Sequence, residues 1–473
     1  MKQDNKNIKN RLAEIAEKDK TADTEQLTDI DYSDDTEQLT EKEKPAAVVK
    51  DTVEAVVKEE KQIGERWIDT FLQKSFTVRG ITFEMIDVLF VAVLWVFAYI
   101  IRYKLFPIES PDYYGFLEQW MEKIEELGGF SSMGTEISNY ACGYMYLMCL
   151  VQSVTDDWLT GLKMISVIFD YAISVAVFLI VFHMTGKTRK SIAGMAFVLL
   201  APTTIIDSAY WCQCDVIYSC FILYALYFIL KDKSSLAMIM LGISFSFKLQ
   251  TVFILPFIII LWLRRYTVKL IHLLWIPVVY VISIFPAWMF GRDFKDLLLF
   301  YFKQGSYYPW GTLEYPNVYA LLDEVIPNGH YSDEVSGAGL FLALMLLGVI
   351  AYYIYTKLGE RDKQLGIINI SRETSGITNE IFILTALLTV AITVYALPHM
   401  HDRYGYLIDI IAIIYAVIRP KRIPLMCAFF VVSILTFMPY LTGVHIFNLQ
   451  TVAIAMTALI AVVGRDLYKE INA

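Results

Sequence analysis

Apolar stretches separated by short polar stretches occupy the chain from about residue 80 to its C-terminal end. Many are roughly twenty residues long, the length that an α-helix needs to cross the hydrocarbon core of a bilayer. The predicted spans are residues 81–101, 162–184, 191–206, 216–230, 270–290, 337–356, 381–397, 404–418, 423–441 and 449–464, with two shorter ones in 234–263. Lys248 interrupts that last stretch. The pattern predicts an all-α polytopic membrane protein with about twelve transmembrane helices.

The loops between these spans differ in charge. Lys and Arg gather in residues 187–190, 231–233, 264–265, 357–372 and 419–422. Such cationic loops usually stay in the cytoplasm, so both chain ends are expected there. The polar, aromatic-rich loops then all fall on the outer side, and they are residues 111–113, 207–215, 291–336 and 398–406. Functional chemistry is therefore expected at the outer face.

The first outer loop has two further features. Arg102 and Lys104 stand at its start, where the positive-inside rule disfavours them unless they meet an anionic ligand. After Asp112 the segment predicts an amphipathic helix at the membrane surface. Residues 139–152 are aromatic, short for a span and interrupted by Gly143, so they predict a re-entrant segment.

The N-terminal part differs in composition. Residues 1–64 are polar, charged and poor in aromatic residues, so they cannot bury enough apolar surface to offset chain entropy. We predict a disordered acidic cytoplasmic tail. In residues 65–79, apolar side chains such as Trp67 and Phe71 recur at helical spacing, which predicts an amphipathic helix in the inner interface or packed against other spans. Residues 80–473 make up the predicted transmembrane domain.

Composition excludes several classes of function. Hydrophobic residues make up 56% of the chain, and the net charge of −9 argues against a nucleic-acid partner. The six cysteines lie in or beside apolar stretches, so free thiols are expected instead of a disulfide framework. Cys212 and Cys214 lack a second pair of ligands, so no metal site is predicted from them.

Asp112 is the candidate catalytic residue. A positioned carboxylate can remove the proton of an acceptor hydroxyl and so activate it as a nucleophile. An Asp directly before a helical stretch is also a common N-cap, whose carboxylate accepts backbone N–H bonds. Both roles remain open, and Tyr113 beside it is a candidate substrate contact.

A second group of candidates is Trp211, Gln213 and Asp215 in one outer loop. The indole of Trp211 can cover the C–H face of a sugar ring, and the amide of Gln213 can bind hydroxyls. An aromatic belt at the membrane interface is the alternative for the tryptophan.

Lys248 and Gln250 form a third group, at the break between two apolar stretches. A cation at membrane depth needs an anionic partner. An ion pair of Lys248 with Asp207 or Asp215 and a contact to a phosphate are both open. Gln250 is a candidate substrate contact.

The densest polar cluster contains His399, His401, Asp402, Arg403 and Tyr404. The planar fork of an arginine suits a phosphate because it donates two parallel hydrogen bonds, and either histidine can add a third. Histidines two residues apart do not share a helix face, so a helical zinc site is disfavoured. An interfacial anchor is the alternative, and it explains one or two polar residues better than five.

Six segments carry a family resemblance, in this order: residues 112–120, 128–130, 139–140, 208–218, 242–250 and 397–404. Together they resemble the bacterial membrane glycosyltransferases of the GT-C superfamily, related to the GPI-anchor mannosyltransferases. The likeness covers about residues 80 to 420.

The resemblance implies a GT-C-like helical bundle in the bacterial cell membrane. The implied reaction is an inverting transfer of one mannose-like or glucose-like hexose from a polyprenyl-phosphate sugar to an acceptor hydroxyl at the outer face. Asp112 maps to the expected base, and His401 and Arg403 map to the expected site of the donor phosphate. The acceptor, whether glycan, lipid or protein, stays open, and no cofactor is implied.

Two positions depart from the family pattern. Cys212 stands where the family often has Gly, which is expected to narrow the space above the tryptophan and puts the identity of the donor sugar in doubt. Asp402 stands where the family often has Glu, a conservative change.

The expected chemistry agrees with the residues. A lipid-phosphate leaving group develops negative charge, which fixed cations stabilise. Lys248 and Arg403 are the first candidates for this role, and Arg292 and Lys303 are further ones. A transporter or flippase of a lipid-linked saccharide is the alternative function, although the membrane part has no clear internal duplication. A scaffold whose acidic tail recruits partners is a third.

Overall fold

The computed structural model describes residues 55–58, 66–304, 310–322, 333–367 and 371–473. It contains two compact units, residues 1–72 and 73–473. Most of the tail that we predict to be disordered lies outside the described residues. In the first unit residues 66–72 are helical, and the exposed rings of Trp67 and Phe71 stack at 6.0 Å.

The second unit opens with a β-hairpin where the sequence predicts the end of a helix. Strand β1 (Ser75–Val78) pairs antiparallel with β2 (Ile81–Glu84). Arg79 and Gly80 between them have φ of 50° and 81°, the backbone of a two-residue hairpin turn. The prediction of a helix over all of residues 65–79 was wrong, because the helical spacing of apolar residues continues past residue 74 although the chain there forms a strand.

Seven helices in the described part of the chain are long and apolar enough to cross a membrane. They are α3 (Met85–Leu105), α6 (Trp158–Thr185), η5 with α12 (Leu270–Met289), α15 (Asp333–Gln364), α16 (Asn379–Ala396), η8 with α18 (Pro420–Thr442) and α19 (Leu449–Ile471). An eighth candidate is α7 (Thr188–Leu200) with the segment Pro202–Tyr210, which is bent from it by 46°. The helices indicate a multi-pass membrane protein.

Four predicted spans form shorter helices, each of at most 16 residues: α9 (Asp215–Leu230), α10 (Ser234–Phe247), η4 with α11 (Leu249–Leu263) and α17 (Tyr406–Ile418). The count of about twelve spans is therefore not confirmed. α5 (Cys142–Val154) occupies the segment predicted to be re-entrant. Lys248 has an extended backbone between α10 and η4, so the predicted interruption of the apolar stretch is present.

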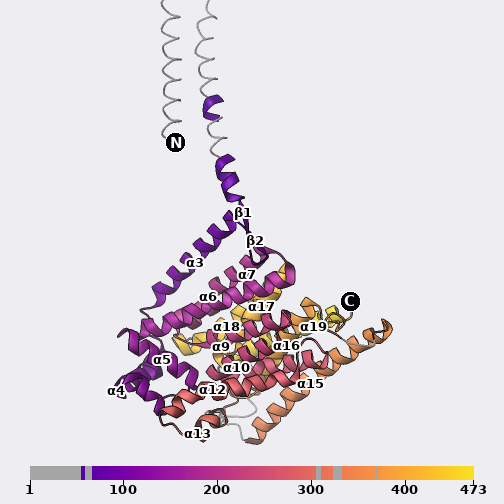
Figure 1. Cartoon of the computed structure of the whole chain (residues 1–473). Coiled ribbons are helices and arrows are strands. Elements are labelled where there is room, and N and C mark those ends of the chain that lie inside the picture. Colours follow the sequence, from indigo (N-terminus) through magenta and orange to yellow (C-terminus); the bar gives the residue numbers. More distant parts are fainter. Residues whose placement is uncertain (1–54, 59–65, 305–309, 323–332, 368–370) are drawn as a thin grey trace, which may run out of the picture. The chain divides into compact units, whose positions relative to one another are not determined.

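Buried helices and lipid-facing helices differ in their exposed surface. α9, α16 and α17 are buried along almost their whole length, whereas α3, α12 and α15 expose many large apolar side chains. Figure 1 shows α9, α10 and α16 in the middle of the bundle of the second unit, with α3 and α15 at its edges. A helix that is apolar on all sides suits the centre of such a bundle, and exposed apolar faces suit contact with lipid.

Arg102, which the positive-inside rule disfavours at the start of an outer loop, has an acidic partner inside the protein. Its Nε lies 2.7 Å from Oδ2 of Asp170 on α6, and both side chains are fully buried. Its Nη1 also donates to the carbonyl of Leu199, at the end of α7, at 2.8 Å. Arg102 therefore links α3 to α6 by an ion pair and to α7 by a hydrogen bond, and it requires no ligand.

Short elements fill the loops at one end of the bundle. The π-helical segment η1 (Tyr113–Leu117) leads into α4 (Glu118–Glu126), which is amphipathic as predicted, with Met121 and Ile124 fully buried. Strand β3 (Thr312–Leu313) pairs in parallel with β4 (Met400–His401). The others are η2 (Gly129–Gly134), α8 (Pro202–Ile205), η3 (Ile206–Tyr210), α13 (Phe294–Leu298), α14 (Phe300–Gln304), η6 (Val318–Leu321) and η7 (Asp402–Gly405).

Candidate functional site

The turn after α3 sets the position of Asp112. Ser110, just before Pro111, accepts a hydrogen bond from the backbone N–H of Tyr113 at 3.2 Å and donates one to the carbonyl of Trp211 at 2.6 Å. Asp112 makes no capping hydrogen bond with its side chain. The N-cap alternative for Asp112 is therefore wrong, because the Ser110 hydroxyl bonds the backbone here and leaves the carboxylate for other contacts.

Lys163 of α6 hydrogen-bonds the backbone of the same turn. Its side chain is fully buried, and Nζ donates to the carbonyls of Leu105, Phe106 and Ile108 at 3.0, 3.1 and 2.5 Å. These bonds satisfy carbonyls that the end of α3 leaves without an intrahelical partner.

Lys163→Met is expected to lower the free energy of unfolding by about 3 kcal/mol, because buried carbonyls lose their donor. Thermal unfolding of the protein in detergent measures the effect. Lys123→Met, on the exposed side of α4, is the matched control and should leave the melting temperature unchanged. Equal melting temperatures for Lys163→Met and wild type would contradict the role of Lys163.

The Asp112 carboxylate is surrounded by donors from distant parts of the chain. Trp211 Nε1 donates to Oδ2 at 2.9 Å, and Gln213 Nε2 donates to the same oxygen. The Tyr440 hydroxyl, at the end of α18, donates to Oδ1. Arg403 Nη1 lies 3.5 Å from Oδ2. The carboxylate is thus held in one orientation by three hydrogen bonds and one ion pair.

Charges of opposite sign alternate beside it. Arg403 Nε lies 3.1 Å from Oδ2 of Asp215, and Lys248 Nζ lies 2.8 Å from Oδ1 of the same residue. The Arg403 guanidinium also lies over the Trp211 ring at 5.4 Å. Asp215 is therefore the ion-pair partner of Lys248 left open by the sequence. Because Asp215 is fully buried, the pair fixes the positions of both cations.

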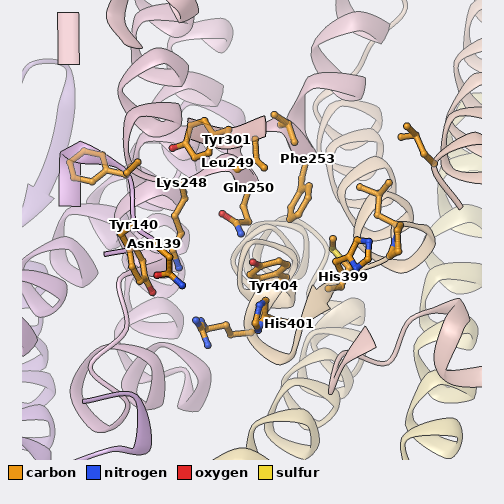
Figure 2. Close-up of a pocket in the computed structure, with 18 of the residues that line it drawn as sticks. Asn139, Tyr140, Lys248, Leu249, Gln250, Phe253, Tyr301, His399, His401 and Tyr404 are labelled. Carbon is orange, nitrogen blue, oxygen red and sulfur yellow. The ribbon is translucent and has the colours of Figure 1, made fainter. Parts of the chain in front are cut away.

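Two cavities meet at these residues. The first has a volume of about 520 Å³, is mostly apolar, and includes Lys248, Gln250, Phe253 and Tyr404 in its wall. Figure 2 shows Tyr140 and Lys248 on one side of it and His399 on the other.

The second cavity has a volume of about 380 Å³ and includes Asp112, Gln213 and Tyr440. Four residues belong to the walls of both cavities: Asn139, Tyr140, His401 and Arg403. The carboxylate and the cations therefore face two spaces that share a boundary.

The two histidines of the predicted cluster differ in role. His399 Nδ1 lies 2.7 Å from the carbonyl of Trp310, and Nε2 lies 3.2 Å from the hydroxyl of Ser336. Both ring nitrogens are thus used to join loop segments to α15. Burial, with Arg403 nearby, lowers the pKa of His401 to about 3, so its ring is neutral at pH 7. His401 can offer a hydrogen bond to a phosphate but no charge.

Asp402 predicts a pH-dependent stability. Burial raises the pKa of its carboxyl to about 7, against the opposing effect of Arg403. The folded protein then binds this proton up to about pH 7, whereas the unfolded chain releases it near pH 4. The contribution of Asp402 to the free energy of unfolding therefore falls as the pH rises from about 4 to about 7.

Asp402→Asn is expected to have the melting temperature of wild type at pH 4 and a melting temperature roughly a few degrees higher than wild type at pH 8. Thermal unfolding in detergent at the two pH values measures the difference. A difference between the two proteins that does not change with pH would contradict the raised pKa.

Several predicted contacts lie away from both cavities. Tyr113 packs in the apolar core, and Trp211 is fully buried against Phe437 and Tyr440. The predicted stacking of Trp211 on a sugar is wrong, because its ring is buried in contacts with the protein. Its Nε1 donates to Asp112, and the Arg403 guanidinium lies over its face. Asp215 likewise holds the cations. The further candidates Arg292 and Lys303 pair with Glu136 and Asp296, at 3.4 and 3.0 Å.

The site also includes residues that were not among the predicted site residues: Trp120, Asn139, Tyr140, Glu314 and Tyr440. Tyr140 donates to Oε1 of Gln213 at 3.1 Å, and Lys248 lies 5.2 Å from its ring centre. Asn139 and Tyr140 opened the predicted re-entrant segment, so a signal for them existed. Tyr440 had none beyond its place at the outer end of a span.

Cys212 is buried outside both cavities, so it does not narrow the space above the tryptophan as predicted. Its φ is 65°, a left-handed backbone that glycine adopts more easily. All six cysteines are free thiols, and the described residues hold no group of three or more side chains suited to a metal ion.

Comparison of the chain with protein-family models and with curated proteins finds no match.

Proposed function

We propose that the protein is a membrane glycosyltransferase that moves one sugar from a polyprenyl-phosphate donor to an acceptor hydroxyl, with Asp112 as general base. One observation carries the proposal. Asp112 lies in the wall of one cavity, and two fixed cations, Lys248 and Arg403, lie in the wall of the other. The two groups meet at the boundary that the cavities share. An inverting transfer of a sugar from a phosphate needs a base and a phosphate site on opposite sides of the sugar.

The larger cavity suits the donor. Its wall is mostly apolar but carries the Lys248 cation, and both features suit a lipid phosphate. Leu340 of α15 also belongs to this wall, and it is 51% exposed on a helix whose outward side is apolar. A polyprenyl chain bound in the cavity can therefore pass along Leu340 into the bilayer. The donor phosphate would meet Lys248, Arg403 and the neutral His401.

The smaller cavity suits the reaction. A carboxylate has about four lone-pair positions, and the three hydrogen-bond donors on Asp112 leave room on Oδ1 for an acceptor hydroxyl. Asp112 takes the hydroxyl proton as the oxygen bonds to the anomeric carbon. The bond from that carbon to the phosphate oxygen breaks, and the phosphate keeps the electron pair. Arg403 and Lys248 stabilise its charge.

A single displacement of this kind inverts the anomeric carbon. The reaction needs no covalent intermediate on the protein and requires neither a cofactor nor a nucleotide-sugar site. The identity of the transferred sugar, a mannose-like or glucose-like hexose, is what the family resemblance implies.

The finer features of the fold belong to the same proposal. Asp112 follows the C-terminal end of α3, and Tyr440 stands at the C-terminal end of α18. The cationic residues 419–422 precede α18, at its other end. With these cations in the cytoplasm, the site faces outward, both termini are cytoplasmic, and the shorter apolar helices complete a GT-C-like bundle of about twelve spans in a bacterial cell membrane.

Purified protein incubated with a panel of polyprenyl-phosphate hexoses and hydroxyl acceptors tests the proposal. A glycosylated product, identified by its mass, is expected with one donor. Reconstituted vesicles separate this function from the alternative of a flippase. Transport of intact labelled lipid-linked sugar, with no new glycosidic bond, would decide for the flippase.

A further inference from the structure

Glu314 faces the cavity that contains Asp112, and its backbone is unusual. Its φ is 63°, a left-handed conformation that disfavours residues with a Cβ atom. The residue follows β3 and forms an isolated bridge with His401. Residues held in such conformations gather at functional sites, where the surrounding structure fixes them.

The loop around Glu314 is tied in place by side chains. Thr312 Oγ1 donates to the carbonyl of Tyr315 at 2.5 Å. Asn317 Nδ2 donates to the carbonyl of Gly311 at 2.9 Å, and Asn317 is fully buried. The left-handed backbone of Glu314 is therefore part of a closed loop.

The Glu314 carboxylate has no partner of its own among the residues whose positions are described. It is half-buried in the cavity wall, so water solvates it incompletely. A carboxylate in this position gains from a ligand that donates hydrogen bonds to it.

The same cavity also has an apolar surface beside the carboxylate. The half-buried indole of Trp120 belongs to the wall, in edge contact with the Tyr140 ring at 5.6 Å. Aromatic rings present a flat face to the C–H groups of a sugar ring, and a carboxylate accepts from its hydroxyls. A lipid alcohol has a single hydroxyl donor, which Asp112 takes, so it leaves Glu314 without a partner. A sugar combines several hydroxyl donors with an apolar C–H face on one ring, and so matches both Glu314 and Trp120.

We infer that the acceptor of the proposed transfer is a saccharide, and that Glu314 selects it by binding ring hydroxyls other than the one that reacts. The inference rests on the proposed function. It places the acceptor in the cavity of Asp112 and Glu314, because the reacting hydroxyl lies at Asp112. The donor phosphate lies across the shared boundary, where Glu314 does not reach the wall.

Two variants separate a binding role from a backbone role. Glu314→Gln keeps the size of the side chain and removes its charge. Glu314→Gly removes the carboxylate and suits the left-handed backbone better, so a loss of function in this variant cannot come from strain. Glu125→Gln, exposed on α4, is the matched control.

The experiment offers methyl hexosides, a diacylglycerol and a peptide with Ser and Thr as acceptors to the purified protein with its active polyprenyl-phosphate donor. Transfer to a hexoside is expected. Both Glu314 variants should raise the acceptor KM roughly tenfold or more, since hydrogen bonds to a charged group are lost, and should leave the donor KM unchanged. Transfer to the diacylglycerol or the peptide alone would overturn the inference, as would an unchanged acceptor KM.

Binding of the methyl hexosides without donor, followed by saturation-transfer NMR, keeps this inference apart from the proposed function. Saturable binding that Glu314→Gly weakens would support the saccharide site even if no donor is consumed. Absence of binding by wild type would contradict the site, whatever the outcome of the transfer assay.

Discussion

Asp112→Asn is expected to abolish sugar transfer in a protein that still folds and binds the donor. The amide has nearly the shape of the carboxylate but cannot take the proton of the acceptor hydroxyl. General bases contribute about 10²- to 10⁴-fold to such rates, so turnover should fall below about one per cent of wild type. The initial rate of transfer from a radiolabelled donor, at saturating donor, measures it.

The control for this variant is Asp156→Asn, in the exposed loop before α6, which should transfer at the wild-type rate. The donor KM of Asp112→Asn should stay within a few-fold of wild type, because the donor phosphate lies with Lys248 and Arg403. Substantial transfer by Asp112→Asn would rule out Asp112 as the base.

Arg403→Lys is expected to lower the rate of transfer by about 10²- to 10³-fold, the usual loss when a fixed donor to a developing negative charge is removed. Arg403 reaches both Asp112 and Asp215 through one planar group, at 3.5 and 3.1 Å. The single ammonium of lysine cannot span both carboxylates and still face the donor. The maximal rate and the donor KM, measured together, are both expected to worsen.

Keeping a positive charge at this position limits damage to the fold, since removal of one partner from a buried ion pair costs about 3–5 kcal/mol. Arg465→Lys, exposed near the end of α19, is the matched control. A wild-type rate in Arg403→Lys would remove Arg403 from the phosphate site and leave that role to Lys248.

Much of the helical arrangement could be predicted because apolar length is a local property. α16 covers 379–396 where the pattern predicts 381–397, and the break at Lys248 follows from one cation inside an apolar stretch. The helices too short to span alone could not be told from full spans, because the apolar pattern continues into the neighbouring turns. The hairpin turn at Arg79 and Gly80 depends on backbone angles that apolar spacing does not report.

The candidate site could be predicted in part. The charge-derived orientation placed Asp112, Gln213 and Arg403 in outer loops, and the fold brings them together. The direction of the Trp211 ring could not be predicted, because it depends on packing against Phe437 of another helix. Tyr440 bonds Asp112 from 328 residues away, a separation that sequence spacing cannot join.

The configuration of the transferred sugar is the most direct test of the proposed reaction. Purified protein is given a polyprenyl-phosphate hexose of known anomeric form, and NMR of the product reports the new glycosidic bond. Direct attack by a hydroxyl that Asp112 deprotonates predicts the opposite anomer. A product with the configuration of the donor would contradict the mechanism, and passage of the intact donor across the membrane without a new bond would contradict the function.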